Sequence, residues 1–220
     1  GYERPTEIQE KAVPALIEGH DMIGIASTGT GKTAAFLIPF IEQLLTGAAT
    51  SGLVVVPTRE LAQQVAEEFK GFTAGMKFRS SCFIGGTSVN NDINNARRQN
   101  HLIIATPGRL IDLIDRNALN LQSISVLILD EFDRMLDMGF IHDVKKIVAI
   151  TKNRNQTLLF SATLPPAQEA LINQIVTNPI KVNVSSGKDA SSNVEQNVLK
   201  LAPGQAKLDG LLNLLSGGGF

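Results

Sequence analysis

One glycine-rich segment restricts the possible folds more than any other part of the chain. It reads Ala26-Ser27-Thr28-Gly29-Thr30-Gly31-Lys32-Thr33. It follows a short apolar run, Met22–Ile25, and precedes a stretch with helical spacing, Ala34–Leu45. Glycines between a strand and a helix allow backbone N–H groups to point at an anion, and the helix adds its positive N-terminal end. The segment therefore predicts a phosphate-binding loop, with Lys32 as a catalytic charge and Thr33 as a Mg²⁺ ligand.

Short apolar runs recur along the chain, separated by segments with helical spacing. The runs are Met22–Ile25, Leu53–Val56, Cys82–Ile84, Leu102–Ala105, Val126–Leu129, Leu158–Phe160 and Ile180–Val184. Most are continuous rather than alternating, which is typical of strands buried on both faces of a parallel sheet. Residues 61–69 and 141–148 carry apolar stripes at helical spacing. We therefore predict an α/β domain of the P-loop NTPase type, with a mostly parallel central sheet and helices on both faces.

Composition limits the partners and the location. The net charge is −1, so nucleic acid would have to bind a local patch rather than the fold as a whole. The one cysteine, Cys82, is expected to be a small buried core residue. A single cysteine cannot form an internal disulfide, which favours a reducing, cytoplasmic location. No apolar stretch reaches the roughly 18 residues that span a membrane, so no membrane partner is expected.

The end of the sequence differs from the rest. Residues 185–193 are polar and rich in serine, as in a linker. Residues 194–220 hold one apolar run and a short helical pattern from Lys207, which is too little for a domain. We expect residues 1–184 to form one domain, 185–193 a linker, and 194–220 the start of a truncated second domain.

Polar, glycine-rich or charged clusters come directly after the apolar runs. They are Gly29–Thr33, Pro57-Thr58-Arg59, Gly85-Gly86, Thr106-Pro107-Gly108-Arg109, Asp130-Glu131-Phe132-Asp133 and Ser161-Ala162-Thr163. The carboxyl ends of parallel strands lie along one edge of a sheet, where such folds bind ligands. We therefore expect these clusters to converge in space.

The acidic cluster suits the chemistry of phosphate hydrolysis. That reaction needs a metal anchor and a group that positions water. Asp130 suits the first role, in part through a bridging water, and Glu131 suits the second. Two acids at a strand end could also be merely solvated, but the phosphate loop upstream favours the catalytic interpretation.

As a set, these motifs resemble those of the DEAD-box family of RNA helicases, over about residues 1–184. Gly1-Tyr2-Glu3-Arg4-Pro5-Thr6-Glu7-Ile8-Gln9 is similar to the Q motif, Ala26–Thr33 to motif I, Asp130–Asp133 to motif II, and Ser161–Thr163 to motif III. Residues 57–62, 85–86 and 106–109 are similar to the RNA-contacting motifs. The resemblance implies a RecA-like domain, ATP and Mg²⁺ as cofactors, and ATP hydrolysis coupled to local unwinding of RNA.

The resemblance also implies roles for single residues. Gln9 would hydrogen-bond adenine, with Tyr2 and Arg4 near the base and Ala26–Thr33 around the phosphates. Asp133, Ser161 and Thr163 would couple hydrolysis to strand separation. The implied RNA contacts are Pro57, Thr58, Arg59, Gly85, Gly86, Thr106, Pro107, Gly108 and Arg109.

A second RecA-like domain, expected in cis outside this chain, would supply an arginine finger. Such a finger contributes about 10³–10⁵ in rate. We therefore expect residues 1–220 alone to bind nucleotide but to hydrolyse it very slowly and not to unwind RNA.

Three positions depart from the family pattern. Phe132 replaces the alanine of motif II, Glu7 replaces a proline of the Q motif, and Ser27 stands where glutamine is common. Phe132 is expected to face away from the metal, and neither Glu7 nor Ser27 has a phosphate-binding role. We therefore expect the chemistry to survive.

Other interpretations fit part of the pattern. An ATP-gated RNA clamp, which holds RNA with little unwinding, needs the same motifs. A P-loop NTPase of another class, such as a GTPase or a DNA translocase, is less favoured, because Gln9 indicates adenine and no Asn-Lys-x-Asp motif occurs. Without the resemblance, Arg59 and Arg109 would be read as structural residues at helix starts. With 5% aromatic residues and no tryptophan, RNA contact is expected through phosphates and 2′-hydroxyls, without sequence preference.

Overall fold

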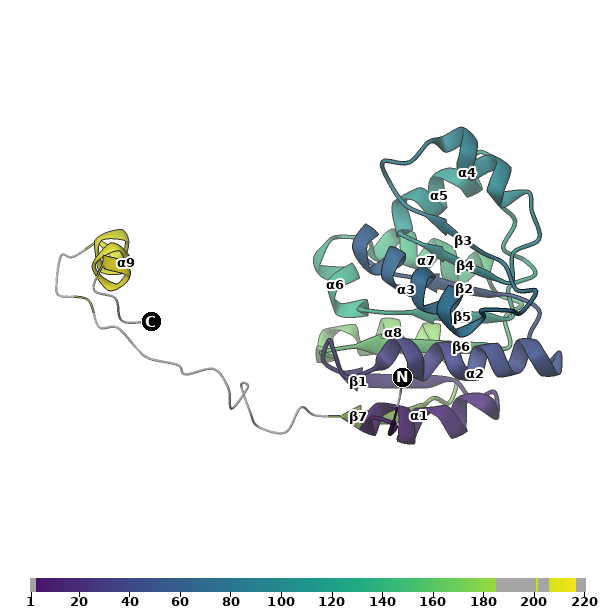
Figure 1. The fold of residues 1–220 in the computed structure, drawn as a ribbon, viewed down its shortest axis with the longest axis horizontal. Helices are drawn as coiled ribbons and strands as arrows, with labels where there is room; N and C mark the ends of the chain where they lie inside the picture. The colour runs from purple at the N-terminus through teal and green to yellow at the C-terminus, as the bar shows by residue number, and fades with distance from the viewer. Residues whose placement is uncertain (1–2, 185–200, 202–205, 217–220) are drawn as a thin grey trace. The chain divides into compact units, whose positions relative to one another are not determined.

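The computed structural model describes residues 3–184, 201 and 206–216 (Figure 1). Contacts divide the chain into two units, Gly1–Ser186 and Gly187–Phe220. The described part of the second unit contains helix α9 (Lys207–Ser216), where the sequence predicted a helical pattern. The predicted linker at 185–193, most of 194–206 and Tyr2 lie outside the described residues. None of the helices described is long and apolar enough to cross a membrane.

A seven-stranded sheet forms the centre of the first unit. Its strands are β1 (Met22–Ala26), β2 (Gly52–Val55), β3 (Ser80–Phe83), β4 (Leu102–Ala105), β5 (Val126–Leu129), β6 (Gln156–Ser161) and β7 (Ile180–Val184). Each predicted apolar run overlaps one of these strands. Their order across the sheet is β3-β4-β2-β5-β6-β1-β7, and every pairing is parallel. The predicted α/β fold is therefore confirmed, and the sheet is wholly parallel rather than mostly so.

Helices cover both faces of this sheet (Figure 1). Helices α1 (Glu7–Ile17), α2 (Lys32–Thr46) and α3 (Arg59–Phe72) share one apolar cluster with the strands. The opposite cluster holds residues of α5 (Pro107–Asp115), α6 (Phe132–Asp137), α7 (Ile141–Ile150) and α8 (Glu169–Ile175), and α4 (Val89–Ala96) packs against it. A short 3₁₀ helix, Pro166–Gln168, precedes α8.

Strand β5 shows why the apolar runs are continuous. Successive side chains of a strand point to opposite faces. Val126 and Ile128 accordingly belong to the cluster with α1–α3, whereas Leu127 and Leu129 belong to the cluster with α5–α8. Strand β5 is buried along its whole length, so its polar side chains begin only after it ends, at Asp130.

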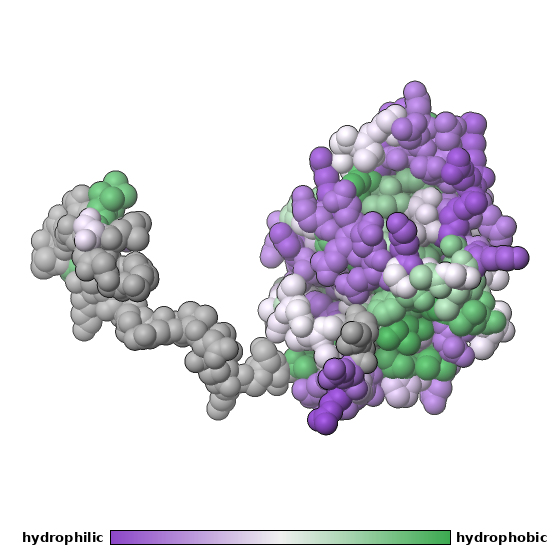
Figure 2. Space-filling model, in the orientation of Figure 1, coloured by the Kyte–Doolittle hydropathy of each residue, from purple (hydrophilic) through white to green (hydrophobic). Residues whose placement is uncertain are grey.

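The drawn face of the first unit is largely hydrophilic, with one hydrophobic area over α1 and α2 (Figure 2). Ile17, Ile38 and Leu45 are large apolar residues exposed on these two helices. Ile38 also lines a cavity that the predicted residues Arg4 and Gln9 border.

Candidate functional site

The predicted polar clusters all follow strands at the carboxyl edge of the sheet, and the strand order separates them into two groups. Strands β5, β6 and β1 are neighbours, and the loops after them carry the phosphate-loop and acidic motifs. Strands β3, β4 and β2 are also neighbours, and the loops after them carry the predicted RNA-contacting residues. We call these groups the phosphate half and the groove half of the edge.

The phosphate loop connects β1 to α2, as predicted, and α2 begins at Lys32. Gly31 has φ 93°, and a Cβ there would lie 2.6 Å from Nε2 of Gln9, so both the backbone conformation and the close contact require glycine. The Thr30 hydroxyl donates to the carbonyl of Ser27 at 2.8 Å. This bond joins the two sides of the glycine turn at Gly29.

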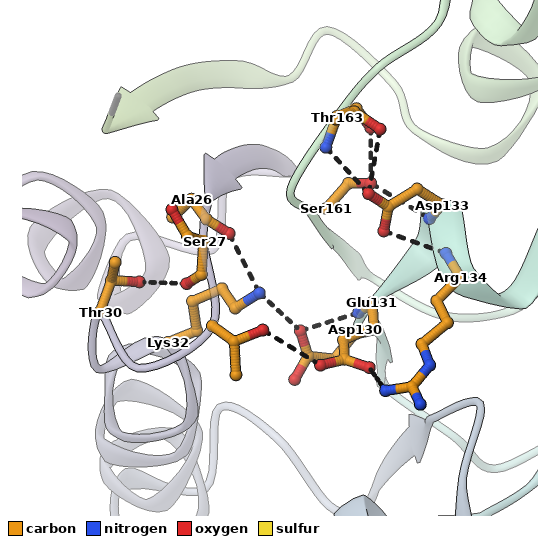
Figure 3. Close-up of polar contacts among 11 residues, drawn as sticks. Ala26, Ser27, Thr30, Lys32, Asp130, Glu131, Asp133, Arg134, Ser161 and Thr163 are labelled. Carbon is orange, nitrogen blue, oxygen red and sulfur yellow. Dashed lines mark hydrogen bonds and ion pairs between the residues drawn. The ribbon is translucent and has the colours of Figure 1, made fainter. Parts of the chain in front are cut away.

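Lys32 points across the loop toward the end of β5 (Figure 3). Its side chain is 7% exposed, and its Nζ lies 3.8 Å from Oδ1 of Asp130. Nζ also donates to the carbonyl of Ala26 at 3.1 Å. Burial raises the pKa of Asp130 to about 6, although the charge of Lys32 opposes this shift. One cation therefore compensates the Asp130 carboxylate only in part.

Glu131 has an unusual backbone conformation. Its φ of 51° and ψ of 51° are left-handed, which is uncommon for a residue other than glycine. One carboxylate oxygen accepts from Arg134 at 3.1 Å, and the other lies 3.5 Å from the Thr28 hydroxyl. Strained residues of this kind concentrate at functional sites. Here the strain turns the Glu131 carboxylate toward the phosphate loop.

A cavity of about 230 Å³ lies between the phosphate loop and the acids. Its lining includes Thr28, Gly29, Gly31, Lys32, Thr33, Asp130 and Glu131, together with Gln64 and Glu68 of α3. No sequence motif includes Gln64 and Glu68, which reach the cavity through the packing of α3.

The donor set around this cavity fits a magnesium ion held together with phosphates. Among the residues described, no group of three or more His, Cys, Asp or Glu could hold a metal. Mg²⁺ at such sites uses one or two carboxylates and completes its shell with water and phosphate oxygens. Asp130 offers one buried carboxylate whose charge Lys32 compensates only in part, and Thr33 offers a hydroxyl. Both suit this way of binding Mg²⁺.

Asp133 joins the acidic motif to the end of β6. Its carboxylate accepts from the backbone N–H and the hydroxyl of Thr163, each at 3.0 Å, and its own N–H donates to the Ser161 hydroxyl at 3.1 Å (Figure 3). Partial burial opposes ionisation, but these hydrogen bonds and one from the Arg134 N–H hold the pKa of Asp133 below its usual value. The structure thus brings Asp133, Ser161 and Thr163 into one network.

Phe132 lies on the opposite side of the acidic motif. It is 1% exposed and belongs to the apolar cluster beneath α5–α8. This burial agrees with the expectation that Phe132 faces away from the predicted metal site. The larger side chain anchors the start of α6 to the core.

Gln9, which precedes the phosphate loop by 17 residues in the sequence, contacts this loop in the structure. Its Nε2 donates to the carbonyl of Gly31 at 3.1 Å, and its Oε1 accepts from the Thr6 N–H at 2.9 Å. Gln9 and Arg4 also line a cavity of about 430 Å³. The remaining lining residues are Glu3, Pro5, Glu10, Val13, Pro14 and Ile38.

The groove half contains a cavity of about 560 Å³. Its lining brings together predicted residues from three loops: Pro57, Thr58, Arg59, Gly85, Thr106, Gly108 and Arg109. Glu60, Met138 and Phe140 line it as well. Met138 and Phe140 were not predicted, since they arrive through the turn at Gly139 that follows α6. Pro107 is buried at the start of α5, and Gly86 follows Gly85 in the same loop.

The two predicted RNA-contacting arginines differ in their surroundings. Arg59 is exposed and begins α3, and Cβ atoms added to Gly85 and Gly86 would lie 3.0 and 2.6 Å from its guanidinium. The Arg109 side chain is only 9% exposed and pairs with Asp92 at 3.0 Å. Arg59 is therefore available to a ligand, whereas Arg109 is committed to the protein.

Comparison with known proteins gives a consistent picture. A family model described as DEAD/DEAH box helicase matches residues 6–172. The chain is 41% identical over 98% of its length to the probable ATP-dependent RNA helicase DDX46 of Pongo abelii, and it covers 22% of that protein. It is also 41% identical over 98% of its length to RNA helicase CrhR of Synechocystis sp., and it covers 44% of that protein. The chain thus spans less than half of these curated relatives.

Solved structures share the fold. A hypothetical ATP-dependent RNA helicase from Sulfolobus tokodaii has a TM-score of 0.78 and 38% identity, covering 84% of this chain and 54% of its own. A DEAD box protein from Methanococcus jannaschii has a TM-score of 0.77 and 37% identity, covering 83% of this chain and 50% of its own. The fold is RecA-like, and the chain belongs to the DEAD-box helicase family.

Proposed function

We propose that this chain is the first RecA-like domain of an ATP-dependent RNA helicase, which binds ATP with Mg²⁺ and one RNA strand. The observation that carries the proposal is the division of one sheet edge into two adjoining sites. The phosphate half holds a buried lysine opposite a buried carboxylate. The groove half holds an exposed arginine beside two glycines.

ATP would bind with its phosphates in the loop 26–33. Lys32 supplies positive charge for the β- and γ-phosphates, and the loop N–H groups and the start of α2 add to it. The Gln9 amide and Arg4 border the neighbouring cavity, whose size and largely apolar lining suit a purine. Breaking the contact from Gln9 to the carbonyl of Gly31 would free the amide for the base.

Mg²⁺, when bound by Asp130 and Thr33, would neutralise charge on the phosphates. Glu131 would hold the attacking water at the γ-phosphate, because its carboxylate faces the same cavity. An arginine from a second RecA-like domain would stabilise the developing charge. The contribution of residues 1–184 would be binding and orientation.

RNA would bind along the groove half through its backbone. The exposed Arg59 suits a phosphate, and N–H groups at Gly85, Gly86 and Gly108 suit phosphate oxygens. None of these groups reads a base edge, so binding should not depend on sequence. Met138 and Phe140 give the groove an apolar side that suits ribose.

Residues 130–140 connect the two sites. The segment begins with Asp130 at the phosphate cavity and ends with Phe140 in the groove. Between them, Asp133 is bonded to Ser161 and Thr163. We infer that this segment and the Ser161–Thr163 loop carry the coupling between ATP hydrolysis and strand separation.

The test uses the longer protein that joins this chain to a second RecA-like domain. ATP turnover should rise with single-stranded RNA and not with DNA, and a short RNA duplex should be released. The Glu131→Gln variant should retain ATP and RNA affinity and lose turnover, while Glu67→Gln on the exposed face of α3 should behave as wild type. Normal turnover by Glu131→Gln would mean that another residue positions the water.

The same experiment separates the helicase from an ATP-gated clamp. A clamp would show RNA-stimulated turnover and ATP-dependent RNA retention without release of the duplex. Failure to bind ATP, or a preference for GTP, would overturn the proposal as a whole. Strong RNA-stimulated hydrolysis by residues 1–220 alone would overturn the dependence on a second domain.

A further inference from the structure

Asp92 is a buried acid that no motif of the sequence includes. It lies on α4, in the segment that follows β3 and the two glycines, and its side chain is 7% exposed. Taking a carboxylate out of water is costly unless charged or hydrogen-bonding partners compensate it. Its Oδ2 accepts from Nη1 of Arg109 at 3.0 Å and from the Thr87 hydroxyl at 2.9 Å. The partners of Asp92 come from the loop after β3 and from helix α5, both in the groove half.

Arg109 holds the same loop by a second bond. Its Nη2 donates to the Thr87 carbonyl at 2.9 Å. The Thr87 hydroxyl also lies 2.9 Å from the carbonyl of Ile84, so its one O–H is shared between this carbonyl and Asp92. Thr87 is therefore held through both its backbone and its side chain, and the loop after β3 is tied to α4 and α5.

The tied loop contains the glycines of the groove. Gly86 directly precedes Thr87 and has φ 87°. The guanidinium of Arg59 lies over Gly85 and Gly86, where any Cβ would meet it within 3.0 Å. A displacement of Thr87 would therefore disturb the groove wall against which Arg59 lies.

We propose that Asp92 and Arg109 are positioning residues that clamp the Gly85–Thr87 loop in the shape that grips an RNA backbone. This rests on the proposed RNA binding. In this arrangement Arg109 contributes to RNA affinity through the loop and does not itself contact phosphate. Asp92 contributes in the same way, although its charge opposes a polyanion.

The direction in which Asp92→Asn changes RNA affinity separates a positioning role of Asp92 from a purely electrostatic one. Removing a negative charge near a phosphate chain should strengthen binding if charge alone matters. If Asp92 clamps the loop, Asp92→Asn should weaken RNA binding, because neutral Asn replaces one charge-assisted hydrogen bond with a weaker one. We expect a loss of about fivefold in RNA affinity. ATP affinity should not change, because the phosphate loop lies in the other half of the edge.

The experiment measures binding of a fluorescent oligouridine and of a fluorescent ATP analogue by the chain, at several salt concentrations. The control is Asp112→Asn, which makes the same change in a more exposed Asp–Arg pair on α5, with Arg116. Asp112→Asn should keep wild-type affinity for both ligands. For Asp92→Asn, the slope of log affinity against log salt should stay as in wild type, since no phosphate contact is lost.

Three outcomes are decisive. If Asp92→Asn binds RNA as tightly as wild type or more tightly, with ATP affinity intact, then Asp92 and Arg109 do not position the Gly85–Thr87 loop. If Asp92→Asn also loses ATP binding, Thr87→Val decides, since it removes the hydroxyl bond to Asp92 and leaves both charges in place. Thr87→Val must then weaken RNA binding alone, and wild-type RNA affinity overturns the clamp. A wild-type chain that binds no RNA contradicts the proposed function itself, whatever the variants do.

Discussion

The phosphate half and the groove half of the sheet edge are built in different ways. In the phosphate half, the side chains that carry the chemistry are buried and face one another, with Lys32 7% and Asp130 3% exposed. In the groove half, one exposed arginine and backbone groups face the cavity, while the second arginine is buried against Asp92. The first half presents charge directly, and the second uses its buried charges to shape a surface.

This difference matches what each proposed ligand requires. A triphosphate places much charge at one point, so fixed side chains can meet it with large energies in a site shielded from water. An RNA strand spreads its charge along a backbone, and gripping it without reading sequence depends on the shape of the contact surface. Substitutions should therefore act on one ligand at a time.

The largest effect is expected in the phosphate half. Lys32→Ala removes a buried cation and leaves Asp130 without a countercharge. ATP affinity should fall by about 10²–10³-fold, as when one partner of a buried charge pair is truncated. Lys11→Ala, in an exposed pair with Glu7 on α1, is the control. Equal ATP binding by Lys32→Ala would refute the assignment of the loop, and an equal loss of RNA binding would remove the separation of the halves.

The next effect concerns the link between the halves. Ser161→Ala combined with Thr163→Ala removes both hydroxyls that bond to Asp133. In the longer protein, duplex release should fall by about tenfold, the loss of roughly one charge-assisted hydrogen bond. RNA-stimulated ATP turnover should stay near wild type, since Lys32, Asp130 and Glu131 are untouched. A parallel loss of turnover and release would place these residues in hydrolysis rather than coupling.

A smaller effect is expected for the exposed arginine of the groove. Arg59→Ala should lower RNA affinity by about fivefold and reduce the salt slope by about one, as for loss of one phosphate contact. Arg116→Ala removes an exposed arginine that pairs with Asp112 and serves as the control. Thermal stability and ATP affinity should be unchanged. An unaltered salt slope would show that Arg59 shapes the groove as Arg109 does.

The sequence was sufficient for the strands and for the convergence of the motifs. Runs such as Val126–Leu129 are continuous because both faces of the sheet are covered, so the strand signal is local and strong. The phosphate loop was also recognisable from the sequence, since its glycines and Lys32 lie next to one another in the chain. The burial of Phe132 in the core was not predicted, since the resemblance implied only that this side chain faces away from the metal.

Local sequence patterns did not predict the order of the strands in the sheet or the side chains that contact one another. Nothing local shows that β2 lies between β4 and β5, and this order divides the edge into two sites. Arg59 and Arg109 looked equivalent because each lies near a helix start. Their difference depends on Asp92, which belongs to another helix and has no motif around it. Met138 and Phe140 reach the groove only because the chain turns at Gly139, which has φ 83°.

The smallest effect tests whether the phosphate half is strained without its ligands. Burial raises the pKa of Asp130 from its ordinary 3.8 to about 6, so the folded chain holds this proton more tightly than the unfolded chain. Ionised Asp130 therefore destabilises the fold at neutral pH, and the penalty declines as pH falls from about 6 toward 4. Without nucleotide and Mg²⁺, Asp130→Asn should raise the melting temperature at pH 7.5 by a few degrees, roughly 2–4 °C per kcal/mol.

The gain should shrink at pH 5, where Asp130 is largely protonated in the folded chain. Asp137→Asn, an exposed site on helix α6, which begins two residues after Asp130, should show no such gain at either pH. With ATP and Mg²⁺ the melting temperature of wild type should exceed that of Asp130→Asn, because the carboxylate that destabilises the free chain is the one proposed to bind the metal. A melting temperature of Asp130→Asn at or below wild type at pH 7.5 would mean that Lys32 already compensates this charge. The phosphate half would then carry no more strain than the groove half, where Asp92 is fully paired.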